Sequence, residues 1–328
     1  MIEIKDLQKT YVARGQVDTV VHALRGVSFE IPEGGAISFI GESGCGKTTV
    51  GRILAGLEEP TSGSIVWNGK NVYELKRKER KEVFRKIQLI HQDPYQALNP
   101  ARSIEQTLAA PLRVMAKKNR RDSDWMKSRM RELLELVGLD PETVMYKYPH
   151  MLSGGQRQRV VIARALTVEP EMLVADEAVS MIDVSLRLGI LKLLRDLRET
   201  LGISLLFITH DVAAARYVGT DGQIYVIYKG LVAEHAMTDD IIMKPVHPYT
   251  QALLSAVPVL KGIEEPGPDR FIPMKDMEQS ESKGCLFAPR CPFAQPLCRD
   301  NRPELTGSSH DHACHFPQER HVVAVATK

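Results

Sequence analysis

The segment "GAISFIGESGCGKTTVGRILAGL", residues 35–57, joins an apolar strand to a glycine-rich loop and then to a helix. Residues 41–48 fit the pattern G-x-x-x-x-G-K-[ST] and directly follow the strand expected at 36–40. Such a loop points successive backbone N–H groups at one centre, and the start of the next helix adds partial positive charge. The segment therefore predicts a phosphate site, with Lys47 reaching the β- and γ-phosphates of a nucleotide and Thr48 offering a hydroxyl to Mg²⁺.

Two further apolar strands end in side chains that suit the same chemistry. "EMLVADE", residues 171–177, ends in two carboxylates, and "SLLFITH", residues 204–210, ends in a histidine. Strands of this kind deliver their last side chains to one edge of a parallel sheet. We expect Asp176 to hold Mg²⁺, directly or through water, and Glu177 to orient and polarise an attacking water. His210 is expected to contact the γ-phosphate or that water from the other side.

Alternating β-type and helical runs predict an α/β fold with a mostly parallel sheet covered by helices. The β signal disappears between about residues 94 and 166, where we expect a helical insertion. One predicted helix there ends at Gly138 and gathers its apolar side chains on one face, namely Met126, Met130, Leu133, Leu134 and Val137. A Gly/Pro-rich stretch after residue 243 leads to a cysteine-bearing tail, so we expect two parts, residues 1–242 and 243–328.

Composition excludes several classes of protein. The 328 residues carry a net charge of +2, are 43% hydrophobic and 26% charged, and give no general attraction to nucleic acid. No apolar run approaches the 18 or more residues that a membrane span needs, and the N-terminus lacks the pattern of an export signal. We therefore expect a chain that is neither exported nor membrane-spanning, with no nucleic-acid partner.

"MLSGGQRQRVVIARAL", residues 151–166, contains LSGGQ, the signature of ATP-binding cassette (ABC) ATPases. With the motifs above, six ordered motifs over roughly residues 1–242 resemble that family. The resemblance implies an ATP site made of Tyr11, Gly41, Glu42, Ser43, Gly44, Cys45, Gly46, Lys47, Thr48, Thr49 and Gln92. It assigns Mg²⁺ to Thr48, Gln92 and Asp176, catalysis to Glu177 and His210, the signature to Ser153, Gly154, Gly155 and Gln156, and the D-loop to Ser180 and Asp183.

The signature also predicts dimerisation. Ser153 and the N–H groups of Gly154 and Gly155 open a second anion-binding helix, which a compact monomer would hold too far from its own phosphate loop. The family resolves this by pairing two cassettes head to tail, so that each ATP lies between one partner's loop and the other's signature. ATP binding then closes the dimer and hydrolysis opens it.

A finer resemblance comes from "HQDPYQALNP", residues 91–100, and "HPYTQALLSAVP", residues 247–258, followed by four cysteines. These segments are similar to the F-type ATP-binding subunit of the oligopeptide/dipeptide importers, a group that includes nickel and opine systems. The resemblance implies a heterodimer with a sister ATPase on the cytoplasmic face of the membrane, two membrane permeases and an extracytoplasmic solute-binding protein. The segment after Gln92 and the helical insertion would contact the permeases. The implied fold has an antiparallel N-terminal β part, a parallel core, a helical subdomain and a small cysteine-rich extension.

Two other functions are open at this point: a soluble ABC ATPase without a membrane partner, and a regulatory switch that binds ATP without turnover. Retention of Glu177 and His210 argues against the switch. The chain has Ala178 where the family usually has proline, and "SMID", residues 180–183, where "SALD" is commoner. Neither change removes a group with a chemical role.

The tail cysteines, Cys285, Cys291, Cys298 and Cys314, have the spacing C-x5-C-x6-C-x15-C. These gaps fit a zinc ribbon poorly, and spacing alone does not separate zinc from an iron-sulfur cluster or from free or disulfide-bonded thiols. The family resemblance favours a four-iron, four-sulfur cluster. The neighbouring histidines His310, His312 and His315 are expected to be exposed tail residues. Cys45 is expected to be only a small residue tolerated in the phosphate loop.

Overall fold

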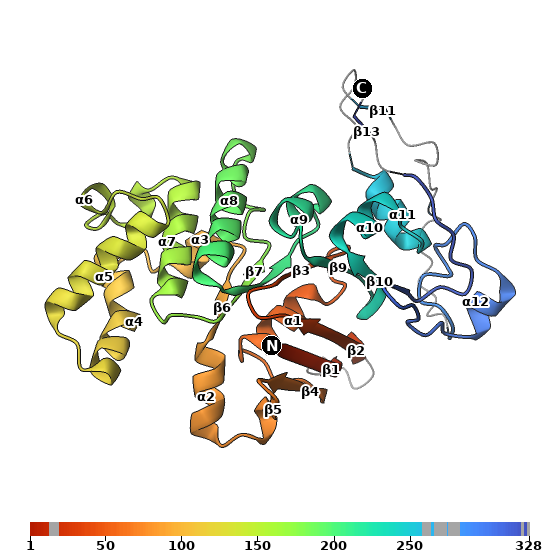
Figure 1. Cartoon of the computed structure of the whole chain (residues 1–328), viewed down its shortest axis with the longest axis horizontal. Coiled ribbons are helices and arrows are strands. Elements are labelled where there is room, and N and C mark those ends of the chain that lie inside the picture. The colour runs from red at the N-terminus through yellow and green to blue at the C-terminus, as the bar shows by residue number, and fades with distance from the viewer. Residues whose placement is uncertain (13–19, 258–263, 266–273, 275–282, 323–324, 327–328) are drawn as a thin grey trace.

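The computed structural model describes residues 1–12, 20–257, 264–265, 274, 283–322 and 325–326. Its centre is a seven-stranded sheet in the order β12-β10-β9-β3-β8-β7-β6 (Figure 1). The five strands from β9 to β6 are parallel, whereas β10 and β12 are antiparallel to their neighbours. The strands are β3 (Ala36–Ile40), β6 (Ile87–Ile90), β7 (Met172–Asp176), β8 (Ser204–Ile208), β9 (Gln223–Tyr228), β10 (Leu231–Met237) and β12 (His310–His312).

Both faces of this sheet are buried, because residues along its parallel strands alternate between apolar clusters on the two sides, and β7 lies between two of these clusters. On β7, Leu173 and Ala175 belong to the cluster formed with helices α7 (Gly154–Leu166), α8 (Val184–Leu201) and α9 (Val212–Val218). Met172 and Val174 belong to the other cluster, which contains helix α1 (Lys47–Leu54). The continuous apolar run of β7 thus reflects burial on both sides, as in other parallel sheets.

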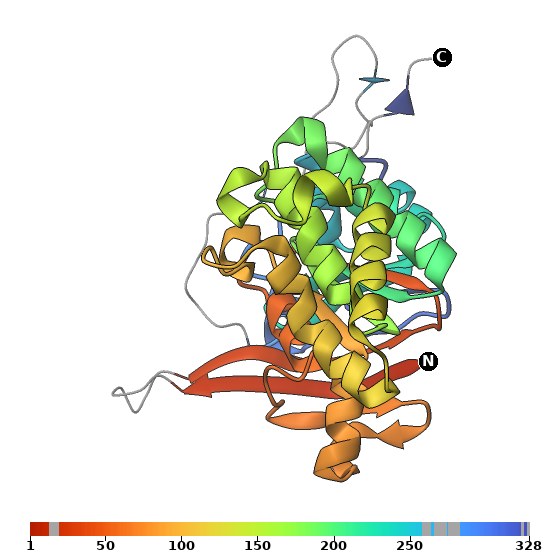
Figure 2. The same ribbon diagram turned by 90° about the vertical axis from the view of Figure 1, so that its left-hand side faces the viewer.

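A second, antiparallel sheet covers the α1 side, in the order β2-β1-β4-β5. Figure 2 shows its red and orange strands along one side of the molecule, away from the green helices. The rings of Phe29, Phe39 and Tyr225 join the two sheets, with centroids 4.8 to 5.8 Å apart. The strands are β1 (Ile2–Val12), β2 (Val20–Ile31), β4 (Ser62–Trp67) and β5 (Lys70–Asn71).

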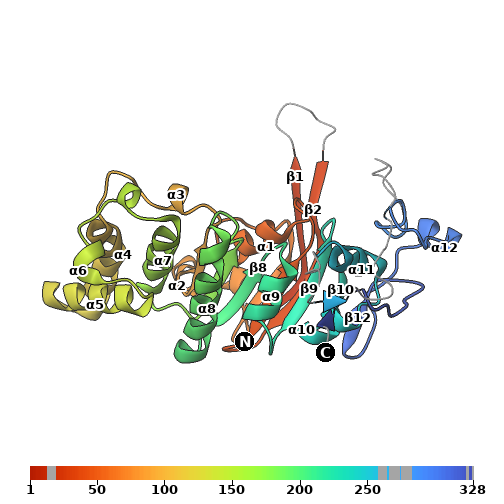
Figure 3. The ribbon, with the colours of Figure 1, turned by 90° about the horizontal axis from the view of Figure 1, so that it is seen from above.

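The predicted helical insertion is present. Residues 94–166, all of them described, form helices and short turns and contain no strand. Helix α5 has Met130, Leu133 and Leu134 buried, and Gly138 follows it with a φ of 71°. The helices are α3 (Pro94–Ala97), α4 (Ile104–Asn119), α5 (Ser123–Leu136), α6 (Pro141–Val144) and α7. Figures 1 and 3 show α4, α5 and α6 at one end of the molecule and the C-terminal segment at the other.

The C-terminal segment packs on the sheet instead of standing apart. Phe287 and Cys291 share an apolar cluster with Ile40 and Val226 of the central sheet and with Tyr249 of α11 (Pro248–Ser255). Strand β12 also extends the sheet at β10. The remaining elements are α2 (Arg77–Arg85), α10 (Thr238–Met243), α12 (Pro296–Asp300), β11 (Glu264–Glu265), β13 (Val325–Ala326) and the 3₁₀ turns Val72–Glu74 and Pro149–Met151. Within the described ranges, no helix has both the length and the apolar character needed to cross a bilayer.

The expectation of exposed tail histidines was wrong. His310, His312 and His315 are half-buried: the first two lie in the sheet strand formed by residues 310–312, and the His315 ring contacts the Asn301 carbonyl oxygen at 2.9 Å. The His310 ring donates to the fully buried carboxylate of Glu234 at 2.6 Å. Glu234 also accepts the N–H groups of Val246 and His247, so one carboxylate ties β12 and the start of α11 to β10. A buried carboxylate with these partners is the anchor of the tail on the sheet.

We predict that His310→Gln loosens the tail by about 1–3 kcal/mol, because it removes a charge-assisted bond from a buried carboxylate. The hydrogen bond to Glu234 raises the pKa of His310 above 6.5. The stabilisation is therefore complete below about pH 6.5 and is lost as the pH rises through the raised value. Hydrogen exchange of residues 310–312, corrected for intrinsic rates, should show this pH dependence in the wild type and lose it in the variant.

His321→Gln is the matched control for this experiment. Its ring belongs to the same tail but forms an exposed ion pair with Glu319 at 3.9 Å. Equal exchange in wild type and His310→Gln at pH 6 would contradict the anchoring role of His310.

Candidate functional site

The phosphate loop lies between β3 and α1, and its glycines are required by positive φ values at three positions and by close backbone contacts at two of them. Gly41, Gly44 and Gly46 have φ values of 153°, 81° and 109°. A Cβ added at Gly41 would lie 2.3 Å from the carbonyl oxygen of Ile227, and one at Gly46 would lie 2.4 Å from that of Ala23. The loop can therefore curl only because these positions lack side chains.

Lys47 lies folded over the loop that precedes it. Its ammonium donates to the carbonyl oxygens of Gly41 at 2.8 Å and Glu42 at 2.9 Å, and it contacts the sulfur of Cys45 at 3.5 Å. The side chain is buried in the described structure. A cation in a glycine-rich loop that leads into a helix N-terminus is a suitable receptor for the phosphates of a nucleotide.

Thr48 and Asp176, the two predicted oxygen ligands of Mg²⁺, lie together. The Thr48 hydroxyl donates to Oδ1 of Asp176 at 3.1 Å. Burial raises the pKa of Asp176, whereas the hydrogen bond from Thr48 acts in the opposite direction and lowers it. A divalent cation at this point would favour the ionised carboxylate, and a hydroxyl plus a carboxylate are oxygen donors that Mg²⁺ accepts.

Glu177 is the meeting point of three predicted motifs. Its carboxylate accepts from the Gln92 amide at 3.1 Å, the Ser180 hydroxyl at 3.0 Å and the His210 ring at 3.4 Å. Its backbone has a φ of 46°, which costs a non-glycine residue on the order of 1–3 kcal/mol. Its N–H donates to the Ile208 carbonyl at 2.9 Å, which holds this conformation. This strained position directly follows β7, and from it the carboxylate reaches Gln92, Ser180 and His210.

The signature occupies the start of α7. Ser153 accepts the N–H of Gln156 at 3.3 Å, and the Gln156 side chain accepts the N–H of Ser153 at 3.0 Å, a reciprocal capping box. Among the hydrogen bonds of the described residues, none joins residues 153–156 to the phosphate loop. Asp183, the other D-loop residue, is exposed at the start of α8.

Tyr11, the expected adenine-stacking residue, lies near the end of β1. Its hydroxyl contacts Glu58, and it is also close to Thr49 of α1. The ring is 37% exposed. Its role toward adenine stays a prediction.

Two residues of the C-terminal segment contact the phosphate loop and were not foreseen from the sequence. The Tyr249 hydroxyl accepts the N–H of Glu42, and Arg290 forms a double ion pair with the Glu42 carboxylate. The partners are 207 and 248 residues apart in the chain. No motif spans such separations, and only the unusual carboxylate within a phosphate loop hinted at a cationic partner.

The four tail cysteines line one small cavity, whose aromatic wall is formed by Phe287, Phe293 and Phe316. The thiols are free, and burial raises the pKa of Cys291 to about 12 and that of Cys314 to about 11. In the described part of the chain, however, no group of three or more His, Cys, Asp or Glu side chains could hold a metal ion. The structure therefore does not contain the metal site expected from the sequence, although the four cysteines line the same cavity.

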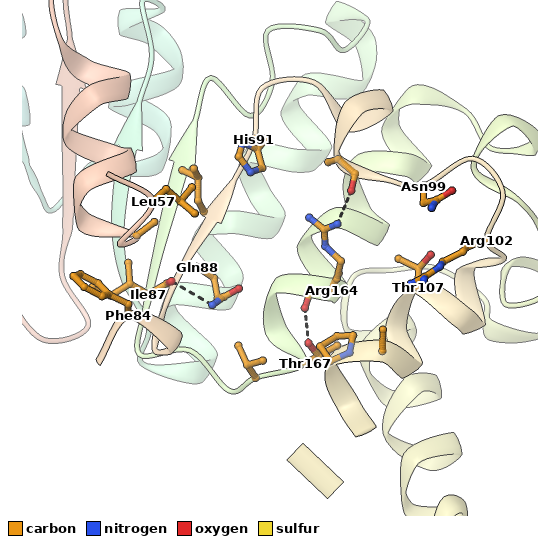
Figure 4. A pocket seen from close by; sticks show the side chains of 16 residues that line it. Leu57, Phe84, Ile87, Gln88, His91, Asn99, Arg102, Thr107, Arg164 and Thr167 are labelled. Atoms are coloured by element: carbon orange, nitrogen blue, oxygen red, sulfur yellow. Dashed lines mark hydrogen bonds between the residues drawn. The ribbon is translucent and has the colours of Figure 1, made fainter. Parts of the chain in front are cut away.

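A larger cavity of about 480 Å³ lies between the sheet and the helical insertion (Figure 4). Figure 4 shows Phe84, Ile87 and Gln88 on one side and Arg164 and Thr167 on the other. Arg164 donates to the Ala97 carbonyl of α3 and so links α7 to the segment after Gln92. The cavity is lined by both apolar and polar side chains, with Arg102 and Arg164 among them, a surface suited to a protein segment.

Comparison with known families matches two parts of the chain. Residues 24–180 match the family "ABC transporter", and residues 233–298 match "Oligopeptide/dipeptide transporter, C-terminal region". The first range includes the phosphate loop, the signature and Asp176–Glu177. The second includes Tyr249, Arg290 and three of the four tail cysteines.

Several proteins are similar to the chain over most of its length. The oligopeptide transport ATP-binding protein AppF of Bacillus subtilis is 36% identical, over 96% of this chain and 97% of its own. The di/tripeptide transport ATP-binding protein DppF of Pseudomonas aeruginosa is 38% identical, over 97% of this chain and 98% of its own. Among solved structures, the ATP-binding cassette MJ0796, a dimer bound to ADP and Pi, is 30% identical with a TM-score of 0.64, over 73% of this chain and 99% of its own.

We predict that Glu177→Gln lowers ATP turnover by about 100-fold or more while ATP binding is retained. The substitution removes the carboxylate that is predicted to polarise water but leaves the phosphate loop and the Asp176–Thr48 pair intact. An ATP-bound dimer should accumulate, and size-exclusion chromatography with ATP would detect it alongside a turnover assay. Glu171→Gln, at the opposite end of β7 in an exposed pair with Lys86, is the control. Normal turnover in Glu177→Gln would rule out the assignment of the base.

Proposed function

The chain belongs to the ABC transporter family, among the oligopeptide/dipeptide transport ATP-binding subunits, and we propose that its ATP hydrolysis powers the import of short peptides. The observation that carries the proposal is the convergence of Gln92, Ser180 and His210 on Glu177, beside the Thr48–Asp176 pair. These contacts supply the parts of an ATPase: a phosphate receptor, oxygen donors for Mg²⁺ and a positioned base. Peptides are proposed as cargo because they are named for the similar proteins.

The proposed reaction uses residues of this chain in defined roles. Residues 41–48 hold the phosphates, and Thr48 and Asp176 hold Mg²⁺. Glu177 takes up a proton from the water molecule while that water attacks the γ-phosphate. Mg²⁺, when bound, neutralises charge that develops on the phosphate oxygens. Gln92 and His210 position the Glu177 carboxylate through their hydrogen bonds, and His210 can also contact the phosphate.

The proposed assembly is a heterodimer with a sister ATPase. The signature supports this, because Ser153 is exposed at the start of α7 and its side chain engages only its own helix among the described contacts. In a head-to-tail dimer this helix start would complete the sister subunit's ATP site, and the sister's signature would complete this one. The exposed Met181 and Asp183 of the D-loop would lie along the same contact.

The proposed membrane partners are two permeases, with an extracytoplasmic solute-binding protein delivering peptide to them. The chain would then sit peripherally on the cytoplasmic face. The cavity between the sheet and the helical insertion is the proposed seat for a permease segment. It borders His91, next to Gln92, and thereby offers a direct route from the permease to Glu177.

We predict that Ala110→Trp, which fills this cavity from α4, abolishes peptide uptake in cells that express the complete importer. Val114→Trp, one turn further along α4 and 60% exposed, is the matched control and should leave uptake unchanged. ATP binding by each purified variant checks folding, and co-purification of the permeases measures assembly. Purification of the wild type without any membrane protein would instead favour a soluble ABC ATPase.

The cofactor proposed for the tail is a four-iron, four-sulfur cluster held by Cys285, Cys291, Cys298 and Cys314. Support comes from the four cysteines, which line one aromatic cavity. Within the described residues these side chains do not form a metal-holding group as they stand, so cluster binding would have to draw the thiols together. Burial raises the pKa values of Cys285, Cys291 and Cys314, so cluster binding would displace protons from these three thiols. Bound, the cluster would cross-link the tail, and its folding role is proposed over a redox role because the tail is small.

We predict that chain purified without air contains about four iron and four sulfide per molecule and absorbs visible light, and that Cys291→Ser loses both. Cys45→Ser is the control, because that cysteine lies in the phosphate loop and away from the cavity. Zinc in place of iron would favour the zinc alternative. A colourless, metal-free wild type prepared in this way would count against any metal.

A further inference from the structure

Glu42, the second residue of the phosphate loop, is held by the C-terminal segment at two points. The two terminal nitrogens of Arg290 donate to its two carboxylate oxygens at 2.7 and 2.9 Å. The backbone N–H of Glu42 donates to the Tyr249 hydroxyl at 2.8 Å. A fork-to-fork arginine–carboxylate pair fixes direction as well as distance, so Glu42 has little freedom to move.

Glu42 in turn fixes the rest of the loop. Its carbonyl oxygen accepts from the Lys47 ammonium at 2.9 Å and from the N–H of Cys45 at 3.3 Å. The residue clamped by the C-terminal segment is thus also the residue on which the phosphate-binding lysine rests. A shift of Glu42 would change the position of the lysine and of the loop N–H groups together.

Arg290 is itself firmly supported. Its N–H and that of Cys291 both donate to the carbonyl oxygen of Phe287 at 2.9 Å, which closes a tight turn. The Phe287 ring packs on Tyr228 and Tyr249, with centroids 5.3 and 5.4 Å away. The guanidinium side chain is only 11% exposed, whereas that of Glu42 is 38% exposed. The rigid partner is therefore the arginine, and the loop is the part that it restrains.

We propose that Arg290 is a positioning residue for ATP, acting through Glu42 to hold the phosphate loop in its receptive shape. The inference rests on the proposed role of residues 41–48 as the phosphate receptor. Two physical effects contribute. The ion pair pre-organises the loop, which reduces the ordering cost of binding, and it neutralises a carboxylate that would otherwise repel the phosphates.

The test is equilibrium binding of ATP to the full-length chain, together with steady-state hydrolysis. Arg290→Ala should weaken ATP binding about 10-fold and raise KM by a similar factor, with kcat changed less than about twofold, because the groups around Glu177 do not contact this pair. Arg290→Lys should recover part of the affinity. Arg320→Ala is the control. This arginine lies in the same tail, 4.4 Å from the centroid of the Phe293 ring, and its substitution should leave ATP affinity, KM and kcat unchanged.

Glu42→Gln approaches the same pair from the loop side and keeps the tail sequence intact. If the pair acts as proposed, Arg290→Ala should add less than about twofold to the effect of Glu42→Gln, because the partner is already lost. Unchanged affinity in Arg290→Ala, or additive effects in the double variant, would overturn the inference while leaving the ATPase assignment standing. Failure of the wild type to bind ATP would instead overturn the proposed function.

Discussion

The parallel pairing of β3, β8 and β7 is the constraint on which the site depends. Ile208 of β8 lies opposite both Phe39 of β3 and Asp176 of β7, so the three strands end at the same level. The loop after β3 and the acidic pair after β7 must therefore meet at one edge. A shift of one residue in the pairing register of β7 with β8 would turn Asp176 to the other face of the sheet and break its hydrogen bond with Thr48.

The contacts at that edge link the chemistry to more distant surfaces. Gln92 and Ser180 each donate to Glu177, yet they come from segments that face different neighbours. Gln92 follows His91 at the large cavity, and Ser180 precedes the exposed Met181. A partner that moves either segment would change the hydrogen bonds of the base. Under the proposed assembly, partners would therefore influence turnover through the hydrogen bonds of Glu177.

The C-terminal segment joins the ATPase sheet at two separate places. At one, the buried Glu234 binds His310 and the start of α11; at the other, Arg290 and Tyr249 hold Glu42. A short segment with few apolar residues gains stability by sharing the sheet's core, through Phe287 in particular. The cysteine cavity lies beside these contacts, since Phe287 also forms part of its wall.

The sequence by itself determined the local parts: the strand, loop and helix around Lys47, the carboxylates that end β7, the helical face of α5 and the spacing of the cysteines. These follow from periodicity and from backbone rules, which act over a few residues. Only the tertiary structure decided that Glu177 collects bonds from Gln92, Ser180 and His210, and that Arg290 reaches Glu42. It also decided that the tail histidines are half-buried in the fold. Those outcomes depend on which strands pair and on which surfaces close over one another, and no local pattern encodes a contact between residues 248 positions apart.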